Sequence, residues 1–338
     1  MAMKALTKPT IYQVAQLAGV SIATVSRAMR DSELVTPQTR ERVRDAARRL
    51  RFTPSQSARS LAQGRHAANG IVFPDLVGPY YAEVILGYEA AAAANGSSVL
   101  ILATNGRRDA AAAVRDLAGR VDGLTVLGRT VGDDVIASIA ASGVPVVLLA
   151  RDPVPGVDTL RAGNTHTAKA LARHLIGHGH RSVTFLGDPA ASPDVAGRWA
   201  GVKAVCGGAA QPVPLKGLDL EAGEKAARAL FREQRPGAVV CANDEVALGV
   251  LLAAEEAGLR VPQDLAVTGW DDLLAARFAG LSTVRQPMRE LGATAARWLD
   301  RRIAETNDEE PTQPARRRIL ATELIIRRTC GSHEEVRQ

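Results

Sequence analysis

The sequence is poor in cysteine and carries no pattern that would tie the chain together covalently. Its three cysteines, Cys206, Cys241 and Cys330, stand far apart. They form neither the paired spacing of a zinc site nor the even set of a disulfide framework, which is typical of a reducing compartment. The N-terminal residues lack the apolar run of a signal peptide, and no stretch is long and apolar enough to cross a membrane. We therefore expect a cytoplasmic protein without a membrane anchor.

Motifs of the common enzyme classes are also missing. The sequence contains no phosphate-binding P-loop, no nucleophile elbow and no histidine-based zinc motif. His174, His178 and His180 lie around a GHGH stretch, where metal ligation is possible in principle. We expect no enzymatic activity, no cofactor and no metal site. A sugar- or nucleotide-handling enzyme of α/β fold is the disfavoured alternative, because no catalytic constellation supports it.

The 338 residues are too many for one ordinary domain, and their charge is unevenly distributed. Residues 1–66 contain 12 lysines and arginines against 4 acidic residues, although the whole chain has a net charge of only +6. The remaining residues hold 30 basic and 32 acidic side chains. A basic excess confined to one segment predicts a surface for phosphates, such as those of nucleic acid.

Residues 10–30, TIYQVAQLAGVSIATVSRAMR, predict two short helices joined by a tight turn. The first has an apolar face at helical spacing, made of Val14, Ala15, Leu17 and Ala18. Gly19 suits a turn with positive φ, Ser21 suits an N-cap, and 22–29 follow as a second helix with Val25 facing inward. These features favour a helix-turn-helix, in which the second helix meets base edges in the major groove. A small helical hairpin without DNA-binding function is the alternative.

A third helix and a linker complete the basic segment. Thr36 and Pro37 open this helix, with proline at its first position. Apolar residues then recur at i, i+3, i+4 and i+7, namely Val43, Ala46, Ala47 and Leu50. Residues 54–64, PSQSARSLAQG, have weak helical character and are fewer than the roughly 12–15 needed for a helix to persist alone in water. The simplest interpretation of this stretch is an interdomain tether.

From residue 69 onward the pattern changes to short apolar runs separated by helical stretches. The apolar runs predict strands at 70–73, 99–103, 123–127, 144–150, 183–186, 238–242 and 265–268. The helical stretches include 80–94, 164–177, 221–233 and 245–257. Strands spaced by helices predict parallel sheets covered on both faces, and the two groups of strands predict two doubly wound lobes.

Together these stretches resemble the LacI/GalR (lactose-repressor) family of bacterial regulators. The resemblance lies in the helix-turn-helix, in VTPQTRERVRDAARRLRFTPSQSARSLAQGR after it, and in PDLVGPYYAEV, CANDEVALG, VPQDLAVTGWDD and STVRQP further on. It implies an N-terminal all-α helix-turn-helix headpiece (1–53), a hinge helix and linker (54–66), an α/β periplasmic-binding-protein-like core (67–330) and a polar tail (331–338). The core lobes would be discontinuous, with an N-lobe of about 67–160 and 288–318 and a C-lobe of about 161–287 and 319–330.

The resemblance implies base contacts by Ile22, Ala23 and Arg27. Arg27 can donate a fork of hydrogen bonds to guanine O6 and N7, whereas the small apolar Ile22 and Ala23 favour thymine methyl groups. The implied phosphate or sugar contacts are Thr10, Tyr12, Ser21, Thr24, Ser26 and Thr36. In the hinge, Leu61 matches the family's minor-groove wedge and Ala58 its neighbour on the groove floor. Ser55 and Gln56 replace a frequent Asn-Arg pair there.

Polar and aromatic residues follow the predicted strand ends, where open parallel sheets bind ligands. The resemblance assigns effector contacts to Arg198, Asn243 and Asp271 and a cleft lining to Tyr80, Tyr81 and Trp270. We expect Arg198 just before a helix around 201–205. Helix capping is the alternative role for Asn243 and Asp271, and it is the favoured role for Asp244. An arginine fork, an aspartate acceptor and an aromatic wall suit a hydroxyl-rich or planar ligand.

The sequence departs from the family near this cleft. Ala150 stands where members often carry an acid, Gly163 replaces a frequent aspartate, and Leu218 stands where an aromatic often stacks on the ligand. The family also has a structural turn at the GH stretch, which favours a structural role for the three histidines.

The predicted function is that of a sequence-specific DNA-binding transcriptional regulator, a repressor that acts as a homodimer on double-stranded operator DNA. A small-molecule effector, a sugar or sugar derivative, would bind between the lobes and change operator affinity through a two-state coupling. A purine-type corepressor is the alternative within the family. A solute-binding protein for transport would share the core but not residues 1–66, so it is disfavoured. Because the ending CGSHEEVRQ is polar and too short for a coiled coil, we expect the core lobes to form the dimer.

Overall fold

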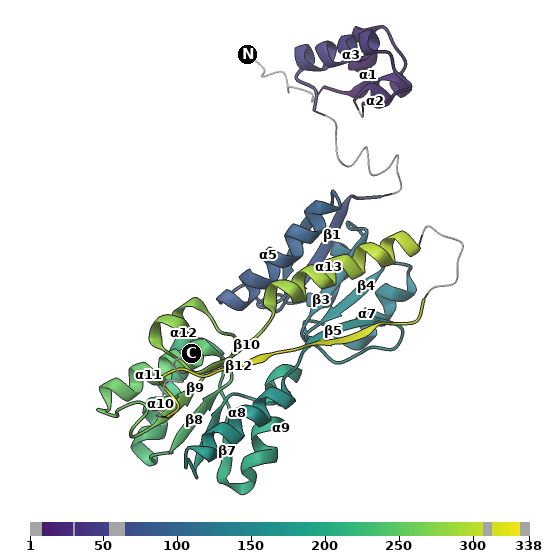
Figure 1. Ribbon diagram of the computed structural model, residues 1–338. Coiled ribbons are helices and arrows are strands. Elements are labelled where there is room, and N and C mark those ends of the chain that lie inside the picture. Colours follow the sequence, from purple (N-terminus) through teal and green to yellow (C-terminus); the bar gives the residue numbers. More distant parts are fainter. Residues whose placement is uncertain (1–8, 30, 54–64, 307–312, 332–338) are drawn as a thin grey trace, which may run out of the picture. The chain divides into compact units, whose positions relative to one another are not determined.

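The computed structural model describes residues 9–29, 31–53, 65–306 and 313–331. The chain divides into two units, Met1–His66 and Ala67–Gln338. The described helices of the first unit, which we call the headpiece, are α1 (Ile11–Ala18), α2 (Ile22–Ala28) and α3 (Pro37–Leu50) (Figure 1). The second unit, which we call the core, contains all the strands of the described residues.

One valine from each headpiece helix forms the centre of a small apolar core. Val14, Val25 and Val43 are fully buried there. Leu17 was predicted to join them, but this prediction is wrong, because its side chain is 45% exposed. At about 100° per residue, a helix that buries positions 14, 15 and 18 turns position 17 away from its buried stripe. The sequence pattern of α1 therefore overstates the width of its apolar face.

The first lobe of the core, the N-lobe, is built on a six-stranded parallel sheet with the order β11-β5-β4-β3-β1-β2. Its strands are β1 (Ala68–Phe73), β2 (Ser98–Ala103), β3 (Gly123–Leu127), β4 (Val146–Leu149), β5 (Asp158–Ala162) and β11 (Arg317–Leu320). Its helices are α5 (Pro79–Ala94), α6 (Ala110–Ala118), α7 (Asp133–Ala141) and α13 (Met288–Glu305). Side chains alternate across the sheet, so Ile71 and Phe73 pack under α5 and α13 while Val72 packs under α6 and α7.

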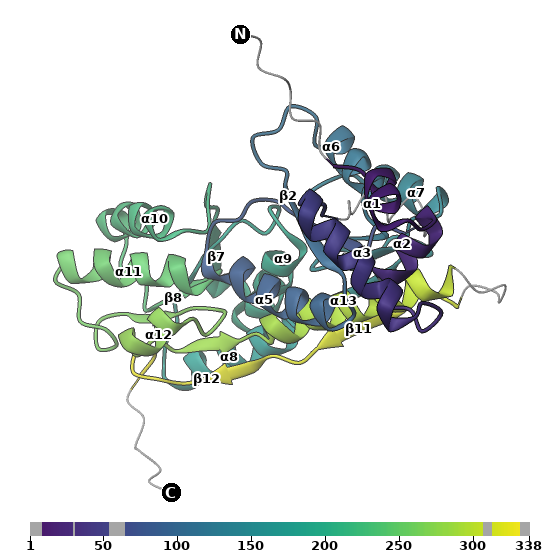
Figure 2. The same cartoon turned by 90° about the horizontal axis from the view of Figure 1, so that it is seen from above.

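Helices α5 and α13 lie side by side over the N-lobe sheet in both views (Figures 1 and 2). Glycines allow this close approach. A Cβ atom on Gly87 would lie 2.0 Å from the Arg289 carbonyl oxygen, and one on Gly292 would lie 2.0 Å from the Val84 carbonyl oxygen. Any side chain at either position would push the two helices apart.

The second lobe, the C-lobe, has a parallel sheet with the order β7-β6-β8-β9 and a separate antiparallel pair, β10 with β12. These strands are β6 (Val183–Leu186), β7 (Ala210–Val213), β8 (Ala238–Cys241), β9 (Ala266–Thr268), β10 (Thr283–Arg285) and β12 (Glu323–Ile325). The helices are α8 (Thr165–Gly177), α9 (Pro193–Cys206), η1 (Gly207–Ala209), α10 (Leu220–Glu233), α11 (Asp244–Glu256) and α12 (Leu274–Ala279). Helices α8 and α9 cover one face of the sheet and α10 and α11 the other.

The chain crosses between the lobes three times. It leaves the N-lobe after β5, returns between β10 and α13, and leaves again between β11 and β12. The yellow C-terminal segment in Figure 1 runs through the last of these crossings. Each lobe therefore combines distant parts of the sequence, and the crossings lie beside the carboxyl ends of the strands where the candidate ligand residues gather.

Candidate functional site

The turn between α1 and α2 has the geometry that a helix-turn-helix requires. Gly19 adopts φ 62°, and a Cβ atom there would meet nothing within 4 Å, so backbone conformation rather than space favours glycine. The Ser21 hydroxyl then accepts a hydrogen bond from the Thr24 amide at 3.1 Å, which caps α2 as predicted. Val25 turns inward, and this leaves the opposite side of the short helix facing outward.

The three predicted base-contacting residues share the outward side of α2. Ile22 is 40% exposed, and Ala23 and Arg27 are also exposed. The hydroxyls of Ser21 and Thr24 lie 2.9 Å apart and hydrogen-bond to each other. Arg27 is the one charged residue of α2 and offers up to five N–H donors, so it can make the fork that guanine recognition needs.

The other predicted DNA contacts are distributed over the headpiece. Thr10, Tyr12 and Thr36 are exposed, while Thr24 and Ser26 are partly buried. Thr36 accepts a hydrogen bond from the Thr39 amide at 3.3 Å and so caps α3. Sequence reasoning missed the exposed side chain of Leu17, which adds apolar surface to α1. Ala58 and Leu61 lie outside the described residues.

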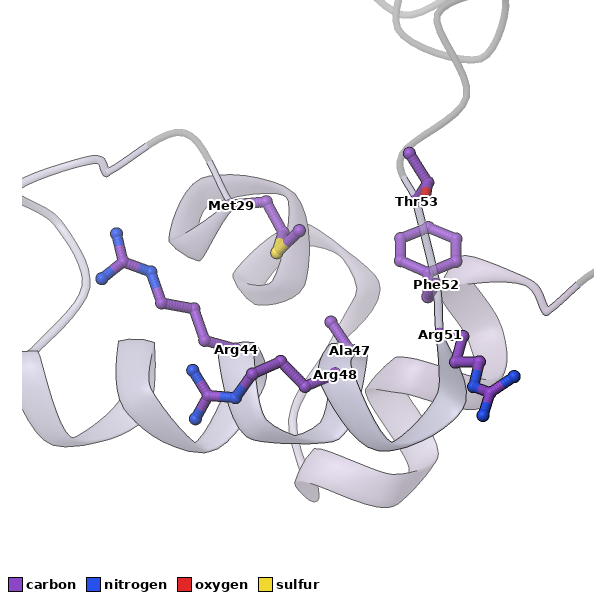
Figure 3. Close-up of a pocket in the computed structure, with 7 residues that line it drawn as sticks. All are labelled: Met29, Arg44, Ala47, Arg48, Arg51, Phe52 and Thr53. Carbon is purple, nitrogen blue, oxygen red and sulfur yellow. The ribbon is translucent and has the colours of Figure 1, made fainter.

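A pocket of about 390 Å³ lies where α2 ends beside the last turn of α3 (Figure 3). It is lined by Met29, Arg44, Ala47, Arg48, Arg51, Phe52 and Thr53. Arg44 forms an ion pair with Asp31, and Arg48 forms one with Glu41 at 2.9 Å. Because two of its three arginines are already paired with acids, this pocket offers little uncompensated positive charge to an anion.

In the core, Arg198 is held rigidly by three groups. Its guanidinium lies 4.8 Å from the centre of the Trp270 ring, and its Nε donates to Asn164 Oδ1 at 3.0 Å. Its Nη1 donates to the Ala242 carbonyl oxygen. Arg198 lies inside α9 rather than before a helix, so the predicted helix start is wrong. The helix begins earlier because Ser192 caps it and Pro193 occupies its first position.

Asp271 lies beside this arginine in a strained turn. Its φ is 121°, and its Oδ1 accepts a hydrogen bond from Gln286 Nε2 at 2.6 Å. Burial raises the pKa of Asp271 to about 6, while the charge of Arg198 and the Gln286 hydrogen bond act in the opposite direction. The second carboxylate oxygen has no hydrogen bond among the described residues and can accept one from a ligand.

Tyr80 and Tyr81 begin helix α5 of the N-lobe and face these C-lobe residues. Their rings meet edge to face with centroids 5.4 Å apart. Burial, followed by the nearby charges of Asp194 and Asp271, raises the pKa of Tyr80 well above its usual value. The Tyr80 hydroxyl of the N-lobe therefore stays protonated at neutral pH, and the charges that act on it include Asp194 and Asp271 of the C-lobe.

Several buried polar atoms of this cleft have no hydrogen-bond partner within the described ranges. They are the Tyr80 hydroxyl, Trp270 Nε1 and Gln286 Oε1. Buried polar groups normally find partners, so such a group of donors and an acceptor points to a ligand or to water. Asn164, Asp194 and Gln286 were missed as cleft residues, although STVRQP contains Gln286 and Asn164 was visible beside Gly163.

Asn243 and not Asp244 caps helix α11, so the prediction that Asp244 is a cap is wrong. Asn243 is the N-cap of α11, since its Oδ1 accepts from the Val246 amide at 2.9 Å, and its Nδ2 donates to the Leu218 carbonyl at 2.7 Å. Asp244 is not the cap. Its carboxylate accepts from the Leu273 amide at 2.8 Å and the Thr283 hydroxyl at 2.6 Å. Burial, reinforced by the charge of Asp271, raises the pKa of Asp244 to about 8.

The clustered histidines surround a buried cysteine near the end of α8. His174 Nε2 lies 3.2 Å from Cys330 Sγ, and His180 Nε2 lies 3.4 Å from the Cys330 carbonyl oxygen. Within the described residues, no group of three or more histidine, cysteine or acidic side chains is arranged to hold a metal ion. In the same part of the chain, no helix has the length and apolar character needed to span a membrane.

Comparison with known proteins gives matches at both ends of the chain. Residues 10–55 match the family described as bacterial regulatory proteins, lacI family, and residues 172–330 match the periplasmic binding protein-like domain. The HTH-type transcriptional repressor PurR of Proteus mirabilis (strain HI4320) is 31% identical over 324 residues, which cover 92% of this chain and 95% of that protein.

Two solved structures extend this likeness. The lac repressor dimer bound to operator and the anti-inducer ONPF aligns with a TM-score of 0.83 and 26% identity, over 96% of this chain and 100% of that one. The transcriptional regulator CelR in complex with cellobiose aligns with a TM-score of 0.68 and 27% identity, over 95% of this chain and 99% of that one.

Fold, turn geometry and these matches define the class: a DNA-binding transcriptional regulator with a periplasmic-binding-protein-like effector domain, and not an enzyme. The chain belongs to the LacI family of bacterial regulatory proteins. The predicted fold class is thereby confirmed.

Proposed function

We propose that this regulator is a cytoplasmic repressor that binds double-stranded operator DNA as a homodimer and whose operator affinity is set by a neutral sugar or sugar derivative. The observation that carries the effector proposal is the group of unpaired buried atoms beside Arg198 and Asp271. Similarity to the operator-bound lac repressor dimer supports the DNA and dimer parts of the proposal.

In the proposed DNA complex, α2 lies in the major groove. Arg27 donates to guanine O6 and N7, and Ile22 and Ala23 contact thymine methyl groups. Phosphate and sugar contacts are proposed for Thr10, Tyr12, Ser21, Thr24, Ser26 and Thr36. The basic excess of residues 1–66 supports this assignment, because phosphate neutralisation supplies much of the affinity for DNA.

The proposed functional parts of the chain are a headpiece at 1–53, a hinge at 54–66, a core at 67–330 and a tail at 331–338. We propose that Leu61 and Ala58 of the hinge enter the minor groove. Dimerisation through the core is supported by helix α12, where Leu274 is 68% exposed and Phe278 is 81% exposed. These two apolar side chains stand at i and i+4 on one helix face, which favours burial against a second copy.

A sugar hydroxyl both donates and accepts hydrogen bonds, so it suits a cleft that mixes both kinds of partner. The Tyr80 hydroxyl and Trp270 Nε1 can donate, and Gln286 Oε1 and Asp271 can accept. Aromatic walls from Tyr81 and Trp270 suit the apolar face of a pyranose ring. We also assign Arg198 and the remaining Nδ2 hydrogen of Asn243 to ligand contact.

A purine corepressor is the second candidate, and the similarity to the PurR repressor favours it. Leu218 does not decide between a purine and a sugar, because the aromatic that it replaces often stacks on the ligand throughout this family. The CelR–cellobiose complex shows that a protein 27% identical to this one binds a sugar.

The effector proposal is tested by thermal unfolding of the full chain with neutral hexoses and disaccharides including cellobiose, with sugar acids, and with purine bases. A true effector at about 100 times its Kd stabilises the folded state by about 2.7 kcal/mol. We expect a neutral sugar to raise the unfolding temperature. Stabilisation by a purine base alone would transfer the assignment to the second candidate, and stabilisation by a sugar acid alone would show that the cleft selects an anion.

The operator proposal is tested by selecting binding sites from random duplex DNA with the full chain. We expect enrichment of a near-palindrome, with one guanine contacted in each half-site and thymines beside it. Recovery of sequences without two-fold symmetry would contradict a homodimer on the operator.

A further inference from the structure

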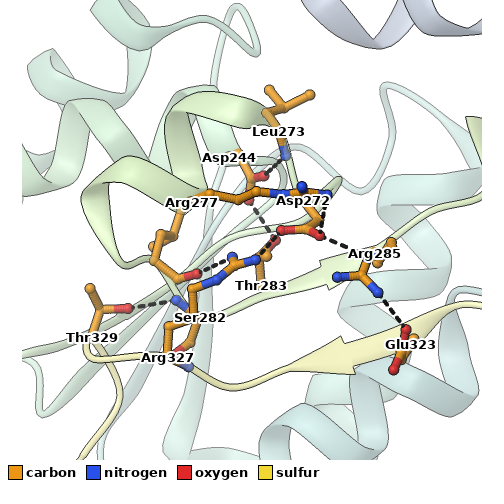
Figure 4. A network of polar contacts seen from close by, with 11 residues as sticks. Asp244, Asp272, Leu273, Arg277, Ser282, Thr283, Arg285, Glu323, Arg327 and Thr329 are labelled. Atoms are coloured by element: carbon orange, nitrogen blue, oxygen red, sulfur yellow. Dashed lines mark hydrogen bonds and ion pairs between the residues drawn. The ribbon is translucent and has the colours of Figure 1, made fainter.

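A buried carboxylate next to the proposed effector site accepts hydrogen bonds from arginines in three separate parts of the C-lobe (Figure 4). The Asp272 side chain is completely buried, and its Oδ2 accepts from Arg285 Nε at 2.8 Å and from Arg277 Nη2 at 3.4 Å. Its Oδ1 accepts from Arg327 Nη2. Arg277 belongs to α12, Arg285 ends β10, and Arg327 follows β12. We call Asp272 with these three residues the arginine clamp.

Asp272 of the arginine clamp belongs to a strained backbone turn. Asp271 has φ 121° and Asp272 has φ 60°, so two consecutive non-glycine residues occupy the region that L-residues avoid. Neighbouring groups hold this turn from both sides. The Asp271 amide donates to the Val284 carbonyl at 2.8 Å, and the Leu273 amide donates to Asp244 at 2.8 Å. A strained turn persists only where its surroundings impose it, and the clamp supplies the charged part of those surroundings.

The clamp is also attached to the segments that cross between the lobes. Arg285 donates to Glu323 of β12 at 2.9 Å, and β12 begins just after the last crossing. The next residue, Gln286, lies where the chain leaves for α13, and it donates to Asp271. Adjacent residues at one crossing therefore hold the adjacent carboxylates of Asp271 and Asp272.

We propose that Asp272 is a positioning residue for the effector site: the arginine clamp imposes the turn that aims Asp271 into the cleft and ties this turn to the lobe crossings. The inference rests on the proposed role of Asp271 as a ligand contact. A ligand bound to Asp271 then acts on Gln286 and Arg285 together, where the chain crosses from the C-lobe to the N-lobe.

The positioning role is measurable without knowing the effector. Trp270 precedes Asp271 in the chain, so its emission reports the ionisation of that carboxylate in a full-length Trp199→Phe/Trp298→Phe background. The charged or polar groups that face Asp271 come from four elements: Arg198 and Asp194 of α9, Gln286 of the crossing, Asp244 and Glu245 of α11, and the hydroxyls of Tyr80 and Tyr81 of α5. Asp244, whose pKa is about 8, gives a second and later step in the same titration. In the unaltered site we expect an emission midpoint near the Asp271 pKa of about 6.

Two substitutions with opposite charge effects separate positioning from simple electrostatics. Asp272→Asn removes a negative charge and Arg285→Met a positive one, so through space they would shift the midpoint in opposite directions. If the clamp positions Asp271, both variants release the turn, Asp271 gains solvent, and both midpoints fall by about one pH unit or more. Arg285 is half exposed, so its substitution leaves the fold intact even where Asp272→Asn does not.

Asp158→Asn is the matched control, because Asp158 is likewise fully buried and held by Arg302, but in the N-lobe sheet. The Trp270 emission midpoint of this variant should stay near that of the parent. Opposite shifts for Asp272→Asn and Arg285→Met, or no shift in either, would overturn the positioning role. Because this titration contains no sugar, its failure is distinct from failure of the thermal screen, which tests the effector proposal itself.

Discussion

The proposed DNA-contacting surface of α2 and the proposed effector site differ in how their residues come together. Ile22, Ala23 and Arg27 lie within one short helix, and their side chains are exposed on its outward side. The proposed effector site combines residues that are far apart in the sequence, such as Tyr80 and Gln286. Its charged and polar side chains form hydrogen bonds with one another. A substitution on α2 should therefore change recognition and leave the fold unchanged, whereas a substitution in the cleft should change both.

The comparison is most sharply tested at Arg27, where we expect the largest effect. Arg27→Ala should cost about 1–3 kcal/mol of discrimination per half-site, because the fork to guanine is lost, and a dimer loses it twice. The matched control is Arg42→Ala, which removes the same charge from an exposed position of α3. Operator titrations with the guanine present or replaced give the measurement. Equal discrimination by the two variants would refute the base contact.

The corresponding change in the cleft is Asp271→Ala. We expect operator binding to persist while affinity for the stabilising sugar falls by about 1–3 kcal/mol for each lost hydrogen bond. Sugar-dependent release of operator, measured by fluorescence anisotropy, reports both properties. Asp264→Ala, at a surface aspartate paired with Arg260, is the control and should respond normally. A normal response in the Asp271 variant would remove this residue from the site.

Burial distinguishes the two regions in their response to pH. Asp244 is fully buried, and burial raises its pKa from 3.8 to about 8. The folded chain therefore retains a proton that the unfolded chain has lost. This contribution to stability is complete below about pH 4 and disappears as the pH rises through about 8.

We expect the free energy of unfolding to fall by on the order of 2 kcal/mol between about pH 6 and about pH 9 through Asp244 alone. Asp244→Asn should flatten this part of the profile, as measured by urea unfolding at several pH values. Asp264→Asn should not, because its hydrogen bonds to Arg260 lower the pKa of that carboxyl. A variant profile as steep as that of the parent would show that Asp244 is ionised throughout the range.

We expect the smallest effect at Ser21, which caps α2 and is also a proposed phosphate contact. Two substitutions at this position distinguish the two roles. Ser21→Ala should destabilise α2 by about 1 kcal/mol, whereas glycine at an N-cap costs only a few tenths of that amount. Loss of the hydroxyl should weaken DNA binding slightly in both variants. Amide exchange of α2 and DNA titration provide the two measurements. A glycine variant that binds DNA like the parent would leave Ser21 as a cap only.

Local interactions explain why the headpiece could be predicted from the sequence. Its turns and helix starts depend on contacts within a few residues along the chain. The structure confirms each predicted residue at such a position, namely Gly19, Ser21, Thr36 and Pro37. In the core, the strands with continuous apolar runs were found. Strands β5, β7 and β11 of the parallel sheets and the separate pair β10 and β12 were missed, because short strands such as RRIL in β11 are recognisable only by their pairing.

The candidate site was less predictable for a related reason. A polar residue after a strand suits both a cap and a ligand contact, and the sequence alone does not decide between them. Asn243 caps α11 with one side-chain atom and still has a hydrogen to offer, so both interpretations fit it. The strained turn at Asp271 and the contribution of Gln286 depend on residues far apart in the chain, which no local pattern contains.

The strand order of the core determines when its two lobes can be completed during synthesis. Strand β11 completes the edge of the N-lobe sheet, and β12 pairs with β10 in the C-lobe, yet both follow residue 316. Helices α1 to α3 leave the ribosome some 270 positions earlier and can close their own core while each lobe still lacks a strand. A nascent or prematurely terminated chain thus has a complete headpiece before either lobe of the core is complete. Termination before residue 317 would therefore give a chain with a complete headpiece and two incomplete lobes, which we expect to lack the response to a ligand.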